Sequence, residues 1–309
     1  MERINHTSSV SEFILLGLSS RPEDQKPFFV LFLIVYLVTI TGNLLIILAI
    51  CFNPHLQTPM YFFLSFLSLT DICFTTSVVP KMLMNFLSEK KTISYAGCLT
   101  QMYFLYALGN GDSCLLAVMA FDRYVAVCDP FHYVTTMSHH HCVLLVVVFC
   151  SFPHLHSLLH TLLLNRLTFC DSNVIHHFLC DLSPVLKLSC SSIFVNEIVQ
   201  MTEAPIVLVT PFLCIAFSYI RILTTVLKIP STSGKRKDFS TSGFNLTVVT
   251  LFYGSIFYVY LQPPSTYTVK DHVATTVYTV LSSMLNPFIY SLRNKDLKQG
   301  LRKLMSKRS

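Results

Sequence analysis

The stretch PFFVLFLIVYLVTITGNLLIILAICF, residues 27–52, decides the fold, because it is long enough to cross a bilayer and holds no Asp, Glu, Lys or Arg. A spanning helix needs about 20 mostly apolar residues, each rising about 1.5 Å. The whole chain of 309 residues is 52% hydrophobic and 12% charged, whereas soluble domains carry about 25% charged residues. With so few charged residues, the surface of a soluble protein would be largely apolar. The composition therefore favours a membrane protein.

Six more apolar runs follow the first, and we predict an all-α membrane protein, a seven-transmembrane helix bundle. The second and third runs each contain one acid, Asp71 and Asp112, and Pro263-Pro264 marks the end of the sixth. A short amphipathic cytoplasmic helix is expected after span seven. The expected extracellular N-terminus is 1–26, the spans are 27–52, 58–80, 97–125, 142–164, 198–226, 239–262 and 271–292, and the cytoplasmic tail is 293–309.

The distribution of Lys and Arg predicts the orientation. The tail 293–309 carries seven of these residues, and the connection between spans five and six carries four. Both segments lie on one side of a seven-span bundle, which we take as cytoplasmic, and the N-terminus is then extracellular. Residues 1–26 lack the basic start of a signal peptide, and Asn5 begins a glycosylation tripeptide. We expect a multi-pass plasma-membrane protein.

Four of the eleven cysteines, Cys98, Cys170, Cys180 and Cys190, face the oxidising compartment in this topology. Four cysteines allow three pairings. The remaining seven lie in spans or at their inner ends, where we interpret them as small hydrophobic residues. A soft metal site at His177 and Cys180 is an alternative only if the Cys180 thiol is free.

Polar side chains inside the bilayer are costly and usually functional. Asp71 lies in span two, Asp112 in span three, Asn43 in span one and Asn286 in span seven. Their oxygen atoms suit a sodium ion, or the two acids share a proton. A hydrogen-bonded cluster that only ties helices together is the third alternative. Apart from sodium, no cofactor and no metal site is expected.

Asp122, Arg123 and Tyr124 lie at the cytoplasmic end of span three. An arginine there can pair with the neighbouring acid and later exchange it for another partner, as a two-state element does. The alternative is an arginine whose head group merely reaches the membrane interface.

The chain resembles a class A G-protein-coupled receptor, and within that class an olfactory receptor, over essentially its whole length. The resemblance is carried by the following segments, which occur in the family's order: GN at 42–43, LQTPMYFFLSFLSLTDIC at 56–73, MAFDRYVAVCDPFHY at 119–133, SYIRI at 218–222, KDFSTSGFNL at 237–246 and SMLNPFIYSLRNKDLKQGLRKL at 283–304. It implies a receptor in membrane lipid that binds a small volatile odorant and activates a heterotrimeric G protein of the stimulatory, olfactory type, raising cAMP. Nucleic acid and enzymatic activity are not expected.

The resemblance also implies roles for single residues. Arg123 is the switch residue that meets the G protein, with Asp122 and Tyr124 beside it. The other switch residues are Tyr219, Tyr290 and the helix-seven hinge Asn286-Pro287, where proline permits a kink. Two disulfides are implied, Cys98–Cys180 and Cys170–Cys190.

By resemblance, the odorant site lies between the outer halves of spans three, five, six and seven. Helical spacing places several residues of each span on one face, and a closed, mostly apolar cavity is the usual small-molecule site. No acid in this set invites an amine. The expected ligand-binding residues are Leu105, Tyr106, Gly109, Asn110, Tyr253, Ile256, Phe257, Tyr260, Thr276 and Thr279.

The chain departs from the family pattern in KDFSTSGFNL, in Ser283, and in Cys150, which stands where many relatives have tryptophan. These changes bear on the strength of G-protein coupling. Three alternatives remain open: a class A receptor for a lipid or peptide, a transporter or channel, and an intramembrane hydrolase. A transporter predicts internal repeats, which are not seen by eye, and neither acid of a hydrolase pair lies in a recognised protease motif.

Overall fold

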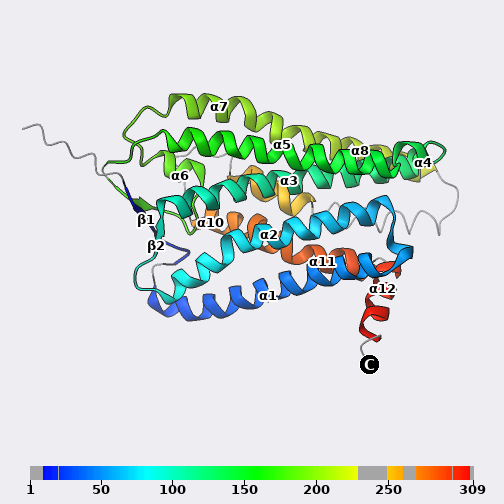
Figure 1. Cartoon of the computed structure of the whole chain (residues 1–309), viewed down its shortest axis with the longest axis horizontal. Helices are drawn as coiled ribbons and strands as arrows, with labels where there is room; N and C mark the ends of the chain where they lie inside the picture. The colour runs from blue at the N-terminus through cyan, green and yellow to red at the C-terminus, as the bar shows by residue number, and fades with distance from the viewer. Residues whose placement is uncertain are drawn as a thin grey trace, which may run out of the picture.

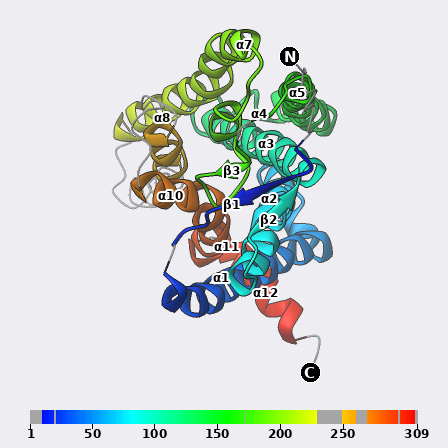
Figure 2. The ribbon, with the colours of Figure 1, turned by 90° about the vertical axis from the view of Figure 1, so that its left-hand side faces the viewer.

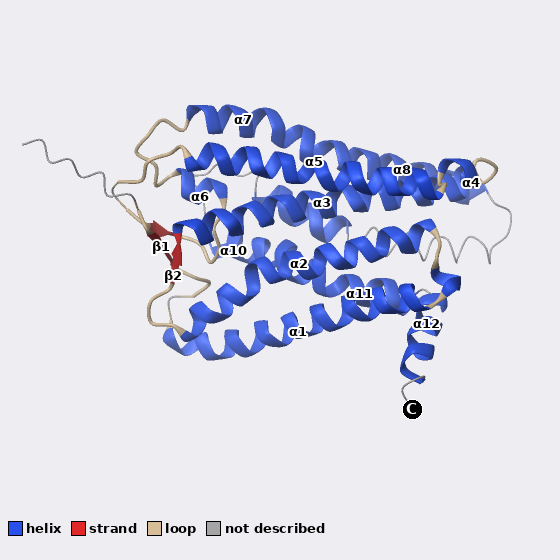
Figure 3. Ribbon diagram, in the orientation of Figure 1, coloured by secondary structure: helices blue, strands red, loops and turns tan. Residues whose placement is uncertain are grey.

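The computed structural model describes residues 10–19, 21–170, 172–228, 249–259, 269–293 and 295–306. Its helices run side by side along the long axis of the molecule (Figure 1), and strands occur at one end only (Figure 3). Tyr260, Asn5 and the segment 237–246 lie outside the described residues.

Five helical stretches in the described part of the chain are long and apolar enough to cross a membrane. They are α1 (Pro22–Phe52), α2 (Pro59–Leu87), α3 (Tyr95–Cys128), α5 (His139–Asn165) and the stretch Phe194–Lys228. The last comprises α7 (Phe194–Ala204), a π-helical segment η2 (Pro205–Val209) and α8 (Thr210–Lys228).

The sixth predicted span is described as a helix only over Val249–Val259. The seventh consists of α10 (Val269–Thr276), a second π-helical segment η4 (Val277–Leu281) and α11 (Ser282–Arg293). Short elements join the long ones: the 3-10 turn η1 (Pro54–Leu56), α4 (Tyr133–Thr136) and α6 (Leu182–Leu186).

Local sequence explains where the long helices begin. Pro22 and Pro59 stand in the first turns of α1 and α2, where a missing backbone N–H removes no helical hydrogen bond. The side chain of Ser94 accepts a hydrogen bond from the Gly97 backbone N–H at 3.1 Å, which caps α3. Ser138 caps α5 in the same way.

A three-stranded sheet covers one end of the bundle, as the end-on view shows (Figure 2). β1 (Glu12–Leu15) lies between β2 (Thr92–Ser94), which is antiparallel to it, and β3 (Val174–Ile175), which is parallel. The side chains of Phe13 and Leu15 in β1 are buried. Both disulfides, Cys98–Cys180 and Cys170–Cys190, are formed at this end.

The seam between α1 and α11 depends on a glycine. A Cβ atom at Gly42 would lie 3.0 Å from the Pro287 Cβ atom, closer than ordinary packing allows. Next to it, Asn43 Nδ2 donates to the Thr39 and Ser283 carbonyl oxygens, each at 3.1 Å. The Gly-Asn pair therefore lets α11 approach α1 and fixes its position.

The chain turns away from the bundle at α12 (Lys295–Ser306), as Figure 1 shows. Leu297 is fully buried, whereas Lys298, Arg302 and Lys303 are exposed. This is the short amphipathic helix that was predicted after span seven, and its basic face is the kind that suits a membrane surface.

Candidate functional site

A cavity of about 110 Å³ lies inside the bundle, between α3, α5, the α7–η2 stretch, helix Val249–Val259 and η4. An apolar cavity of about 150 Å³ holds benzene, so this one suits a ligand with a similarly small number of heavy atoms. Its lining combines aliphatic side chains with amide, phenol and imidazole groups. The lining residues are Leu105, Tyr106, Gly109, Asn110, His156, His160, Gln200, Val207, Leu208, Ile256 and Tyr278.

The structure brings together half of the residues predicted to bind a ligand. Leu105, Tyr106, Gly109 and Asn110 line the cavity from α3, and Ile256 lines it from the opposite helix. The i, i+1, i+4, i+5 spacing on α3 therefore does mark one face of that helix.

Four other predicted residues lie beside the cavity lining. The Tyr253 hydroxyl hydrogen-bonds Ser113 on α3, and its ring packs against Phe212, which Phe257 also contacts. Thr276 and Thr279 turn their hydroxyls back to carbonyl oxygens of their own helix, at 2.8 and 2.6 Å. Tyr260 lies outside the described residues.

Six lining residues were not singled out from the sequence: His156, His160, Gln200, Val207, Leu208 and Tyr278. Two of them carry a recognisable signal, because histidines four residues apart in an uncharged span share one helix face. Val207 and Leu208 lie in η2, and Tyr278 lies in η4. The two π-helical segments thus both contribute to the cavity, as π-turns often do at functional sites.

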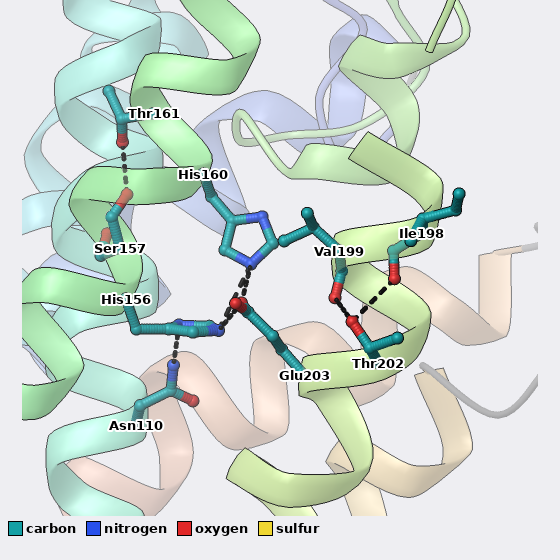
Figure 4. A network of polar contacts seen from close by, with 9 residues as sticks. All are labelled: Asn110, His156, Ser157, His160, Thr161, Ile198, Val199, Thr202 and Glu203. Atoms are coloured by element: carbon teal, nitrogen blue, oxygen red, sulfur yellow. Dashed lines mark hydrogen bonds and ion pairs between the residues drawn. The ribbon is translucent and has the colours of Figure 1, made fainter. Parts of the chain in front are cut away.

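A polar network joins α5 to α7 in the cavity wall (Figure 4). His156 Nε2 lies 3.0 Å from Glu203 Oε2, and His160 Nε2 lies 3.3 Å from the same oxygen. The two Nε2 atoms are 3.3 Å apart. Asn110 Nδ2 lies 3.3 Å from His156 Nδ1, so the network reaches α3. Three ligating atoms thus converge on one point.

The loop between α5 and α7 contacts the cavity lining. Tyr106, in the lining, donates its hydroxyl hydrogen to Asp181 Oδ1 at 3.0 Å. Gln101 Oε1 accepts from the Cys180 backbone N–H at 2.9 Å. The Cys98–Cys180 disulfide therefore holds a loop that contacts the lining directly. It also occupies the Cys180 thiol, which leaves the soft-metal alternative at His177 without its sulfur ligand.

His177 lies in the same loop and is completely buried. Its ring centroid is 4.8 Å from that of His272. Burial, and next the neighbouring His272, lower the pKa of His177 to about 3, so the folded protein holds this imidazole neutral.

The four polar residues predicted to share a cluster in the middle of the bundle are all buried. Asn286 Nδ2 donates to Asp71 Oδ2 at 2.8 Å, and Thr70 Oγ1 donates to Asp112 Oδ1 at 2.5 Å. The Oδ1 atoms of Asn43 and Asn286 have no hydrogen-bond partner among the described residues. Asp71 and Asn286 are thus in direct contact, and carboxylate and amide oxygens are donors that fit a hard cation.

Near the C-terminal end of α3, Asp122 and Arg123 have separate partners. Asp122 is buried and accepts a hydrogen bond from the Tyr133 hydroxyl of α4 at 2.9 Å. Arg123 Nη2 contacts the Met60 sulfur on α2, and within the described chain its buried Nε lacks a partner. The expected local pairing of Arg123 with a neighbouring acid is thus replaced by pairing of that acid with a tyrosine.

The other predicted switch residues lie on α3, α8 and α11. Tyr124 stacks on Phe121, with ring centroids 6.2 Å apart, and its ring lies 6.1 Å from Phe217 on α8. Tyr219 on α8 is buried, and Pro287 packs against Gly42. Tyr290 lies in α11, and its side chain is outside the described set.

Comparisons with known proteins agree along the whole chain. The family model described as "Olfactory receptor" matches residues 32–308. The chain is 96% identical to human Olfactory receptor 1L8 over 309 residues, with all of both chains covered. It is 70% identical to human Olfactory receptor 1L1 over 301 residues, which are 97% of this chain and 84% of that one. It is 53% identical to rat Olfactory receptor 1f45 over 302 residues, 97% and 96% of the two chains.

Proposed function

Because the chain belongs to the olfactory receptor family, we propose that its odorant binds in the cavity between α3, α5, η2, helix Val249–Val259 and η4. The family fixes the broad function: the protein is a multi-pass class A G-protein-coupled odorant receptor and not an enzyme. The single observation that carries the proposal is that five of the predicted contacts line one cavity in the bundle.

The cavity lining suggests the chemistry of the ligand. Its volume of about 110 Å³ suits a compact molecule, and aliphatic side chains make up much of the wall. Asn110, Gln200 and Tyr278 offer hydrogen bonds that would orient an oxygen-bearing group. The lining residues include no acid, and the Glu203 carboxylate in the wall beside them is already paired with His156 and His160, so a cationic amine is a poor fit.

We propose that ligand binding is read out at Arg123. An odorant shifts the equilibrium only if it binds the active conformation more tightly. In that conformation the cytoplasmic end of helix Val249–Val259 would move away from α3, and Arg123 would exchange Met60 for the tip of the G protein. A guanidinium suits this exchange because it stays charged and its planar fork can accept new partners. We assign the partner to the stimulatory, olfactory type of G protein.

The cluster around Asp71 would hold a sodium ion or a shared proton. The unpaired oxygen of Asn286, whose amide nitrogen donates to Asp71, supports this assignment, because a buried acceptor without a donor is costly. Asp71, Asp112 and Asn286 would be the direct ligands, and the ion would tie α2, α3 and α11 in the resting conformation.

We place the receptor in the plasma membrane with its N-terminus outside. Two disulfides lie at the end of the bundle that carries the sheet, which suits an oxidising compartment. The basic face of α12 lies at the other end, where anionic cytoplasmic lipid would attract it.

The test is a cAMP assay on cells that express the receptor, with an odorant panel graded by molecular size and with mock-transfected cells as background. Leu105→Phe should reduce the response to the larger active odorants, because Leu105 lines the cavity and the larger ring would take up part of its volume. Leu108→Phe is the matched control, since Leu108 lies buried on the same helix outside the lining. Equal effects of the two variants, at equal surface expression, would place the odorant elsewhere.

A further inference from the structure

Three metal-ligating side chains meet on the wall that α5 and α7 form beside the cavity (Figure 4). His156 and His160 lie one helical turn apart on α5, and Glu203 faces them from α7. One ligating atom from each lies within 4.8 Å of the other two.

The distances within this triangle are close to those of a zinc tetrahedron, with one edge about 0.3 Å shorter. Zinc binds nitrogen and oxygen at about 2.0–2.2 Å, and tetrahedral geometry then places neighbouring ligand atoms about 3.3–3.6 Å apart. The three observed separations are 3.0, 3.3 and 3.3 Å. Hydrogen bonds alone explain the triangle less well: when both imidazoles donate to the carboxylate, their Nε2 atoms face one another with no proton between them to share.

Charge points the same way. Oε2 of Glu203 is buried in a helix long and apolar enough to cross the membrane, where an uncompensated carboxylate is expensive. Among the described residues, its ion-pair partners are the two imidazoles. A divalent cation would compensate the carboxylate and leave both histidines in the neutral form that binds metals.

We propose that His156, His160 and Glu203 bind a Zn²⁺ ion that links α5 to α7. Two histidines and one glutamate form a zinc ligand set that leaves a fourth position open. Both histidines line the cavity, so that position faces the space assigned to the odorant. One carboxylate leaves the site with a net positive charge, which favours water or an anionic donor as the fourth ligand.

Asn110 would support the site as a positioning residue. Its amide lies 3.3 Å from His156 Nδ1, and the nitrogen and oxygen of an amide are exchanged by a simple flip. With the oxygen toward the ring, it accepts the Nδ1–H proton that a metal-bound imidazole carries. This fixes the ring so that Nε2 points at the metal.

The experiment uses full-length receptor without a polyhistidine tag, purified in detergent micelles and stripped with a chelator. Zinc is titrated against a chromophoric chelator, and Co²⁺ is substituted to read the coordination geometry from its visible absorption. Wild type should bind one tight zinc and give the intense cobalt spectrum of a tetrahedral site.

Variants define the ligands. Zinc binding should be weakened in each of the variants His156→Gln, His160→Gln and Glu203→Gln. The loss should exceed the roughly 10- to 100-fold that results when a residue hydrogen-bonded to a metal ligand is removed. His154→Gln is the matched control on α5, because its Nδ1 atom instead hydrogen-bonds the Tyr103 hydroxyl. Glu203→His should retain binding, since three histidines also form a zinc site.

Surface expression and the apparent Tm of each variant serve as controls for correct folding. Zinc should raise the apparent Tm only where the site is intact. The proposal is overturned if wild type and the triple variant H156Q/H160Q/E203Q take up zinc with the same affinity and stoichiometry. The three side chains would then be held together by hydrogen bonds through a shared proton. Because the readout is metal binding, the outcome does not depend on where the odorant binds.

Discussion

Replacing Gly42 by alanine tests the close approach of α1 and α11 beside the hinge proline. Gly42→Ala places a methyl group 3.0 Å from Pro287 Cβ and 3.1 Å from its Cγ. Gly111→Ala is the matched comparison, because a Cβ atom there meets no heavy atom within 4 Å outside its own helical surroundings. Both residues lie inside long helices.

The magnitudes follow from two opposing effects. Alanine is favoured over glycine within a helix by about 1 kcal/mol, and both variants gain this. At position 42 the methyl must displace Pro287, and overpacking of this kind costs about 1–3 kcal/mol. Gly111→Ala should therefore stabilise the receptor by about 1 kcal/mol, while Gly42→Ala should leave it unchanged or destabilise it by up to about 2 kcal/mol.

The assay is thermal unfolding of the two purified variants in the same detergent and at the same heating rate, because irreversible unfolding makes the apparent Tm depend on both. At about 2 °C for each kcal/mol, the variants should differ by about 2–6 °C. A difference below 1 °C would refute the close contact. If α11 is displaced at its hinge, the basal cAMP level of Gly42→Ala should also change.

Four further outcomes are expected. Arg123→Ala should abolish odorant-evoked cAMP while surface expression and odorant binding persist; normal signalling would make this arginine an interfacial anchor. Asp71→Asn should change the sodium or pH dependence of signalling, and no change in either would support a cluster that only ties helices together. Burial keeps the pKa of His177 at about 3, so the unfolded chain takes up a proton below about pH 6.5 that the folded one refuses. Stability should fall as the pH drops from about 6.5 toward 3, and His177→Gln should flatten this dependence; parallel curves would contradict the reasoning. Peptide mapping of the unreduced receptor should find Cys98 joined to Cys180, and a free thiol in folded receptor would exclude the bond.

Hydropathy made the fold predictable, because lipid imposes one length and one polarity on every spanning helix. Helix ends were harder to place. Span three was expected to end at 125, and α3 continues to Cys128, because Cys128 is neither charged nor a helix breaker and its sulfur contacts Thr225 Oγ1 on α8 at 3.3 Å. Contacts of this kind come from the neighbouring helix, and periodicity within one helix does not contain them.

The cavity was predictable where a helix is regular and not where it is irregular. Spacing on α3 identified four lining residues correctly. On the seventh span, α-helical spacing favoured Thr276 and Thr279, but η4 begins directly after Thr276 and presents Tyr278 to the cavity instead. A π-turn holds more residues than an α-turn, so it shifts which residues share a face. Glu203 was overlooked for a simpler reason: it immediately precedes the uncharged run that begins at residue 204.

The sheet at one end of the bundle also constrains how the receptor is synthesised. β1 is synthesised well before its neighbour β3, and Asn173 Nδ2 donates to the Glu12 carbonyl oxygen across 161 positions. At about 5–20 residues per second, translation needs about 10 to 30 seconds to deliver that partner. During this time β1 is a strand with at least one unpaired edge, open to association with other chains. Four membrane-length helices are synthesised between the two events. The quantity of receptor that leaves the site of synthesis should therefore depend on chaperones that protect this N-terminal strand until β3 has been synthesised.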